Sequence, residues 1–138
     1  MQVSVSWRGQ MAFEGETGSG HRLMLDGPPD LGGDDRGPRP MEMLLLGLGS
    51  CSGVDVVHIL QRGRHDVSDC VVEVSGERAD EPPKVFTKIH LHYRVSGRGL
   101  KDSVVRRAVA LSAEKYCSAS LMLAKAAEIT HDFEVIEA

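Results

Sequence analysis

The sequence has few aromatic residues, and it lacks a long uninterrupted hydrophobic run. Phe, Trp and Tyr make up 4% of its 138 residues, so a hydrophobic core must be built mainly from aliphatic side chains and methionine. The most apolar run, over 43–54, is too short to span a bilayer. The chain also opens without a charged-then-apolar leader, which is the signature of a signal peptide. We therefore expect a cytoplasmic protein with no membrane partner.

An excess of charge of one sign is missing as well. The 16 basic and 20 acidic residues give a formal net charge of −4. The basic residues are scattered and do not alternate with aromatic ones, so nucleic-acid binding has little support. The length suits one compact domain, and we expect a single domain over 1–138.

Cysteine is scarce, and its spacing excludes the common two-cysteine motifs. Cys51, Cys70 and Cys117 form no Cys-x-x-Cys pair, which argues against a thioredoxin-like motif and a zinc ribbon. An odd number of cysteines in a cytoplasmic protein also argues against a framework of structural disulfides. We assign no role to Cys70, which opens a predicted strand.

Hydrophobic periodicity and turn residues predict an α+β fold in the order strands, helix, strands, helices, strand. The expected strands are 2–7, 11–13, 22–25, 70–77, 84–95 and 129–136, and the expected helices are 40–62, 100–115 and 118–127. A loop rich in Gly, Pro and Asp is expected over 27–39.

The strand over 84–95 shows the clearest alternation between apolar and polar residues. Ile89, Leu91, Tyr93 and Val95 fall on one face by a period of two. Phe86 falls on the other face with the polar residues, which suggests some cover on that face.

The long helix over 40–62 is apolar on nearly every side, which predicts that it is buried on nearly every side. From position 41 to 53 its only ionisable side chains are those of Glu42 and Cys51. The same stretch holds three glycines: Gly47, Gly49 and Gly53. Together they cost roughly 3 kcal/mol of helix propensity against alanine. We infer that the close approach of a second helix, from another subunit, offsets this cost.

Two of the thiols have neighbours that suit chemistry. Cys51 has small neighbours that leave room for a substrate, and Asp55 and His58 share its helix face. Cys117 stands at the start of the third helix, where unpaired N–H groups favour a thiolate, and Lys115 adds a nearby positive charge. Either cysteine alone could equally be a packed thiol.

The pair is more informative than either member. A thiolate that attacks a peroxide O–O bond becomes a sulfenic acid, and a second thiol within reach condenses with it to a disulfide. Such a pair needs an apolar pocket for the organic group, a positive group to hold the thiolate charged, and a carboxylate to orient that group.

The stretch PMEMLLLGLGSC over 40–51, followed by DVV over 55–57, resembles the signature helix of the OsmC/Ohr family. This family comprises osmotically induced and organic hydroperoxide resistance proteins. Its second cysteine stands between two helices, as Cys117 does in EKYCS over 114–118. Cys117 follows Cys51 by 66 residues (51 to 117), close to the usual spacing of the family.

The resemblance implies an intertwined homodimer in which both chains build each sheet and two central helices cross. It also implies reduction of hydroperoxides, preferably organic ones, by an external dithiol of the lipoyl type, without a metal or flavin cofactor. Cys51 would be the peroxidatic residue, Cys117 the resolving one and Glu42 the carboxylate of the site.

The sequence departs from the better-studied family members in two places. Their helix begins Pro-Glu, whereas Met41 stands at that position here and Glu42 comes one residue later. One residue turns a side chain by about 100° around a helix. The family's N-terminal arginine has four candidates in this chain: Arg8, Arg22, Arg36 and Arg39.

Three functional hypotheses follow. The first is a thiol-dependent peroxidase that uses Cys51 and Cys117. The second, suggested by the departure at Met41 and Glu42, is a non-catalytic protein that binds a small apolar or acyl ligand beside Cys51. The third is a metal site formed by Cys51, Cys117 and His58. The His-x-His pair over 90–92 fits a solvated strand face better than a metal site.

Overall fold

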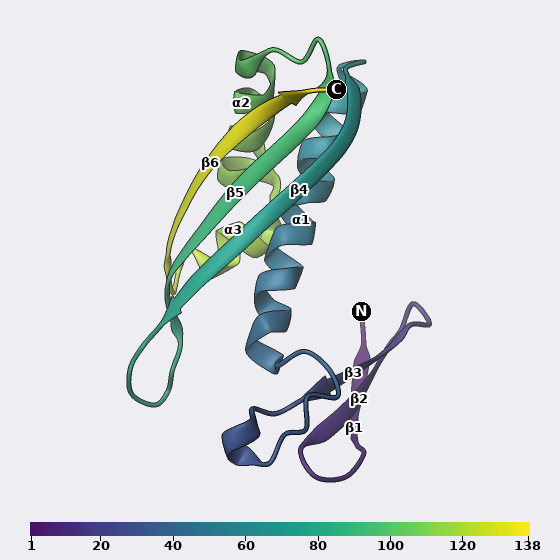
Figure 1. Ribbon diagram of the computed structural model, residues 1–138, viewed down its shortest axis with the longest axis vertical. Helices are drawn as coiled ribbons and strands as arrows, with labels where there is room; N and C mark the ends of the chain where they lie inside the picture. Colours follow the sequence, from purple (N-terminus) through teal and green to yellow (C-terminus); the bar gives the residue numbers. More distant parts are fainter. The chain divides into compact units, whose positions relative to one another are not determined.

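A computed structural model describes all residues from 1 to 138, and its elements follow the predicted order (Figure 1). The chain forms two compact units, 1–44 and 45–138. Helix α1 (Pro40–Arg62) has the predicted bounds, and it begins in the first unit and continues in the second. The two units are described separately below, and the single domain over 1–138 stays a prediction.

The first unit is an antiparallel sheet in the order β1-β2-β3. Its strands are β1 (Val3–Trp7), β2 (Ala12–Thr17) and β3 (Arg22–Asp26). Strand β2 is longer than predicted, because Gly15 belongs to the strand rather than to the following turn. Gly15 pairs with Leu23, and the Leu25 side chain lies 3.5 Å from where its Cβ would be.

Asp26 organises the loop that follows β3. Its side chain is buried, and its Oδ2 accepts hydrogen bonds from the backbone N–H groups of Asp34 (3.0 Å) and Arg36 (3.1 Å). These two bonds hold the pKa of Asp26 below its ordinary value. The predicted loop over 27–39 is confirmed, with one short 3₁₀ turn at Pro29–Leu31.

The second unit is a three-stranded sheet in the order β4-β5-β6, with helices on one face (Figure 1). Strands β4 and β5 are antiparallel, whereas β6 runs parallel to β5. The parallel pairing needs a crossover, which the two predicted C-terminal helices supply. The elements are β4 (Asp66–Arg78), β5 (Phe86–Arg98), α2 (Asp102–Leu111), a π-helical turn (Ser112–Tyr116), α3 (Ser118–Leu123) and β6 (Glu128–Glu137).

A β-bulge at Thr87 corrects the prediction for β5. The predicted apolar face is confirmed by four buried residues: Ile89, Leu91, Tyr93 and Val95. Phe86 is buried with them, so its placement on the polar face is wrong. The pairing shifts register between Glu77–Lys88 and Arg78–Phe86, which leaves Thr87 as the extra residue. The shift turns Phe86 to the core face, where its ring covers Gly76.

Helix α1 has one buried face in the single chain, so the expectation of burial on nearly every side is wrong there. Its buried residues are Leu48, Gly49, Ser52, Val56 and Leu60. This face packs on β4: a Cβ at Gly49 would lie 2.9 Å from Val74 Cγ2, and one at Gly53 would lie 3.5 Å from Val72 Cγ2. Gly47 has no such neighbour within 4 Å. The sheet of the same chain therefore accounts for Gly49, whereas an alanine would fit at Gly53.

Replacing Gly49 with alanine is expected to destabilise the protein. The new methyl group would meet Val74 at a distance that real Cβ atoms do not adopt. Overpacking of this kind costs about 1–3 kcal/mol, which matches or exceeds the gain in helix propensity of about 1 kcal/mol. Urea unfolding monitored by circular dichroism measures the change.

Gly53→Ala is the matched control, one helical turn further on the same face. Its methyl group meets Val72 at ordinary van der Waals distance, so we expect a stabilisation of about 0.5–1 kcal/mol. Equal effects of the two substitutions would contradict this account of the helix–sheet contact.

Candidate active site

The fold brings Cys51 and Cys117 together from positions 66 residues apart in sequence (51 to 117). Cys51 lies on α1 and is half-buried, whereas Cys117 is fully buried at 0% exposure. Cys117 stands at the joint between the π-helical turn and α3, as the sequence predicted. Both are free thiols in this structure.

Burial dominates the electrostatics of Cys117. It raises the pKa of the thiol above its ordinary value, and hydrogen bonding with Cys51 and the charge of Cys51 add to the rise. The hydroxyl and backbone N–H of Ser120 oppose it, and the N–H lies 3.3 Å from the sulfur. The expectation of a favoured thiolate at this position is therefore wrong. The ammonium of Lys115 lies over the Tyr116 ring, 5.3 Å from its centroid.

A buried chain of hydroxyl groups lies beside the two thiols. Tyr93 on β5, Ser52 on α1 and Ser112 in the π-helical turn are each at most 1% exposed. Ser52 Oγ lies 2.5 Å from Tyr93 Oη and 2.8 Å from Ser112 Oγ. Ser112 then donates to Oδ2 of Asp55, 3.0 Å away. Burial raises the pKa of Tyr93, and the charges of Cys117 and Asp55 contribute to that rise.

Only part of this chain of hydroxyls has a signal in the sequence. Asp55 was noted because it shares the helix face of Cys51. Ser52, Tyr93 and Ser112 were missed as a group, because nothing in their local sequence shows that three separate elements meet at one point. A tyrosine on the apolar face of a buried strand is a weak hint, since its hydroxyl needs a partner there.

Cys70 belongs to the same interior. It lies on β4 opposite Val95 and is half-buried. Burial raises the pKa of its thiol, and the charge of Asp69 adds to the rise. Its own charge contributes to the raised pKa of Tyr93, so the third cysteine also lies near the hydroxyl chain.

Glu42 caps the start of α1. Its Oε1 accepts a hydrogen bond from the backbone N–H of Arg39 at 2.8 Å. This is one of the two hydrogen bonds of a capping box, the one from the side chain of the third helical residue to the backbone N–H of the N-cap residue. The role of Glu42 as the carboxylate of the thiol site stays a prediction.

Two of the candidate arginines form ion pairs within the first unit, Arg8 with Glu14 and Arg22 with Glu16.

The single chain does not assemble the predicted metal site of Cys51, Cys117 and His58. No group of three His, Cys, Asp or Glu side chains in the structure is arranged to hold a metal ion. His58, the expected third ligand beside Cys51 and Cys117, is exposed.

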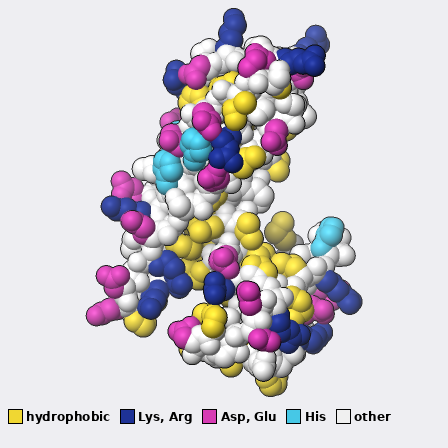
Figure 2. Space-filling view, in the orientation of Figure 1, with side chains coloured by type: hydrophobic (Ala, Val, Ile, Leu, Met, Phe, Trp, Pro, Cys, Tyr) yellow, Lys and Arg dark blue, Asp and Glu magenta, His cyan; other side chains and the backbone are white.

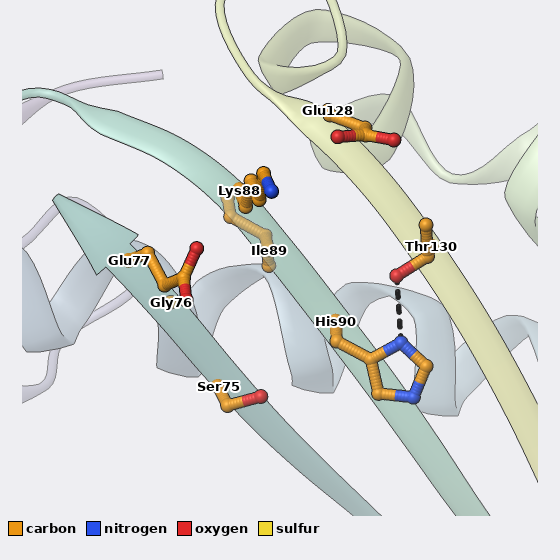
Figure 3. Close-up of a pocket in the computed structure, with 8 residues that line it drawn as sticks. All are labelled: Ser75, Gly76, Glu77, Lys88, Ile89, His90, Glu128 and Thr130. Atoms are coloured by element: carbon orange, nitrogen blue, oxygen red, sulfur yellow. Dashed lines mark hydrogen bonds between the residues drawn. The ribbon is translucent and has the colours of Figure 1, made fainter.

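His90 and His92 lie on the polar face of β5, opposite the buried residues of that strand. Figure 2 shows histidine side chains beside acidic and basic ones on the surface of the molecule. Oδ1 of Asp132 lies 2.9 Å from His90 Nε2 and 2.7 Å from His92 Nδ1. The hydrogen bond to Asp132 raises the pKa of His92. Further along this face, a hollow of about 440 Å³ lies between Glu77, Lys88 and Thr130, where Thr130 also bonds His90 (Figure 3). These contacts fit the predicted solvated strand face.

Comparison with known proteins identifies the family. The model of the OsmC-like protein family matches residues 32–132. The chain belongs to the OsmC family. It is 53% identical to Protein YhfA of Escherichia coli (strain K12) over 138 residues, which is 100% of both chains. It also matches the crystal structure of a hypothetical protein from Aquifex aeolicus VF5 with a TM-score of 0.88 and 31% identity, covering 99% of this chain and 96% of that one.

The fold extends to more distant OsmC relatives. The organic hydroperoxide resistance protein OhrB of Bacillus subtilis matches with a TM-score of 0.64 and 18% identity, over 96% of each chain. The α+β fold of the OsmC/Ohr type is thereby confirmed.

Helix α1 as a whole is long and apolar enough to cross a membrane by length and composition, although its most apolar run, over 43–54, is too short to do so. Core helices of soluble proteins pass the same test, and OsmC family proteins are generally soluble.

The three cysteines are expected to differ in their reactivity toward iodoacetamide. Cys117 is fully buried and its pKa is raised, so it should react slowest, by about tenfold or more. Cys51 and Cys70 are half-buried and should react first. Mass spectrometry of peptides after timed alkylation at pH 7.5 measures the three rates. In urea the rates should converge, and a native-state rate for Cys117 equal to that of Cys51 would contradict the structure.

Proposed function

We propose that this protein is a thiol-dependent peroxidase that reduces organic hydroperoxides through Cys51 and Cys117 in defence against oxidative stress. The observation that carries the proposal is the meeting of a half-buried and a fully buried thiol from distant parts of the chain. Cys51 is the accessible one and attacks the peroxide. Cys117 is shielded from solvent and serves as the resolving thiol.

Each step of the proposed reaction balances. The Cys51 sulfur attacks the O–O bond, takes one oxygen as a sulfenic acid and releases the alcohol, which carries the thiol proton. The Cys117 thiol then displaces the hydroxyl group as water, and a disulfide forms. An external dithiol of the lipoyl type reduces this disulfide by thiol–disulfide exchange and is itself oxidised to a disulfide. No metal or flavin takes part in any step.

The comparisons support this proposal at the level of the family. The OsmC family model covers the helix with Cys51 and the joint with Cys117. A structural neighbour of the same fold is named an organic hydroperoxide resistance protein. We place the reaction in the cytoplasm, where reductants return protein disulfides to thiols.

We also propose that the protein works as a homodimer, because each unit exposes an apolar surface. In the first unit, one face of the sheet carries Val3, Val5 and Trp7, which are 69%, 61% and 65% exposed. In the second unit, the open face of α1 carries Leu46 at 58% and Val54 at 68% exposure. Exposed apolar surface of this kind marks an interaction site. A second copy covers both surfaces and supplies the neighbour that Gly47 lacks.

The peroxidase proposal predicts that each of the two thiols is required for turnover. The purified protein is given cumene hydroperoxide and dihydrolipoamide, and consumption of the peroxide is followed. Cys51→Ser should abolish turnover, and Cys117→Ser should allow about one equivalent of peroxide to react before Cys51 is over-oxidised. Cys70→Ser is the matched control and should retain turnover.

A wild-type rate no higher than that of Cys51→Ser would reject the peroxidase.

The same assay tests Glu42, whose carboxylate accepts a hydrogen bond from the backbone at the start of α1. If Glu42 serves only as a cap, Glu42→Gln lowers the melting temperature slightly and leaves turnover unchanged. If it also orients a charged group at the thiol, turnover falls about tenfold or more.

The dimer proposal predicts that a charge on the open face of α1 separates the subunits. Val54→Glu should convert a dimer into a monomer in light scattering coupled to gel filtration, because an unpaired buried carboxylate is strongly disfavoured. Val85→Glu places the same charge at a residue that is also exposed, at 47%, and should leave the mass unchanged. A wild-type mass of one chain would contradict the proposal.

A further inference from the structure

The polar groups beside the thiols form one continuous hydrogen-bonded chain. Because a carboxylate can only accept, Ser112 donates to Asp55, and the Ser112 oxygen is left to accept from Ser52. Ser52 in turn accepts from the hydroxyl of Tyr93. Every hydroxyl therefore donates one bond in the same direction, toward Asp55.

This chain is unusual in so apolar a core. Burying a hydroxyl without a partner costs about 1–3 kcal/mol, and replacing a fully paired set with apolar groups of the same shape can be nearly neutral. Stability alone therefore gives no reason for three hydroxyls at this point. Their positions in the chain suggest another reason, since two of them lie beside the backbone that carries the thiols.

Ser52 and Ser112 connect the two cysteine-bearing segments. Ser52 directly follows Cys51 on α1. Ser112 opens the π-helical turn, and its carbonyl accepts the backbone N–H of Cys117 at 2.8 Å, which closes that turn. The bond between the two serine hydroxyls thus joins the segment of the attacking thiol to the segment of the resolving thiol. π-Helical turns are often found at functional sites.

We propose that Tyr93, Ser52, Ser112 and Asp55 are positioning residues that hold Cys117 against Cys51 and so set the rate at which the disulfide closes. The proposal rests on the proposed function, because closure is its resolving step. In that step the S–S bond forms, the S–O bond of the Cys51 sulfenic acid breaks, and the thiol proton of Cys117 leaves with the hydroxyl as water. The role assigned to the network is this closure alone, so we expect the attack of Cys51 on the peroxide to be independent of it.

The first test measures disulfide closure without peroxide. Reduced protein is mixed with diamide, quenched by alkylation and analysed by mass spectrometry for the Cys51–Cys117 disulfide. Ser112→Ala and Tyr93→Phe should slow closure by about tenfold or more, because small displacements of reacting atoms cost large factors in rate. The matched controls are Ser103→Ala, an exposed serine on α2, and Tyr116→Phe, the chain's other tyrosine. Both controls should close at the wild-type rate.

The second test separates positioning from stability. With cumene hydroperoxide and dimedone present, the sulfenic acid at Cys51 is divided between the disulfide and the dimedone adduct. The network variants should consume the first equivalent of peroxide at the wild-type rate but shift the product toward the adduct. A residue with only a structural role would lower the melting temperature and leave this partition unchanged.

The two proposals can fail separately. Closure at the wild-type rate with diamide in both Tyr93→Phe and Ser112→Ala, or an unchanged partition, would overturn the positioning proposal and leave the peroxidase intact. A wild-type protein that closes the disulfide with diamide but does not reduce hydroperoxides would overturn the peroxidase. Tyr93→Phe removes a hydroxyl that makes one bond at the end of the chain, whereas the Ser112 hydroxyl makes two, so Tyr93→Phe keeps the test valid if Ser112→Ala does not fold.

Discussion

The hydrogen bond between the hydroxyls of Ser52 and Ser112 is the contact on which the thiol site depends. It connects α1 with the crossover that leads from β5 to β6, and these two segments carry one cysteine each. The bond is excluded from water, so it has a stronger directional effect than the apolar contacts around it. The apolar contacts bring the elements together, and this bond selects one alignment.

The approach of α1 to the sheet makes that alignment possible. Gly49 and Gly53 lie against Val74 and Val72, so the helix axis can sit close to β4. A larger residue at Gly49 would lift the helix and lengthen the distance that Ser52 must bridge. Gly49 therefore weakens the helix locally and allows the polar contact of Ser52, about one helical turn further on. This is why a long helix of low local propensity is compatible with an ordered site.

Local signals in the sequence were sufficient for the element order and for the two thiols, but not for their surroundings. The apolar stretch over 40–62 predicted α1 with its bounds, and the alternation along β5 predicted its buried face. The bulge at Thr87 could not be foreseen, because it depends on how β5 pairs with β4. Burial of Cys117 was underestimated for a similar reason, since the effect of a helix start on a thiol depends on how much water remains around it. The hydroxyl chain was missed because its members come from three elements.

The π-helical turn lets the location of the second thiol tolerate one change in chain length. Such a turn accommodates one residue more than an α-helical turn over nearly the same rise. Deleting a single residue from Ser112–Tyr116 would therefore let the segment relax into ordinary α-helix, and the segment that follows would keep its helical phase. Deleting a residue from α2 has no such outlet and would turn everything that follows by about 100°. The position of Cys117 is therefore expected to survive a one-residue deletion in the π-helical turn and to be lost after one in α2.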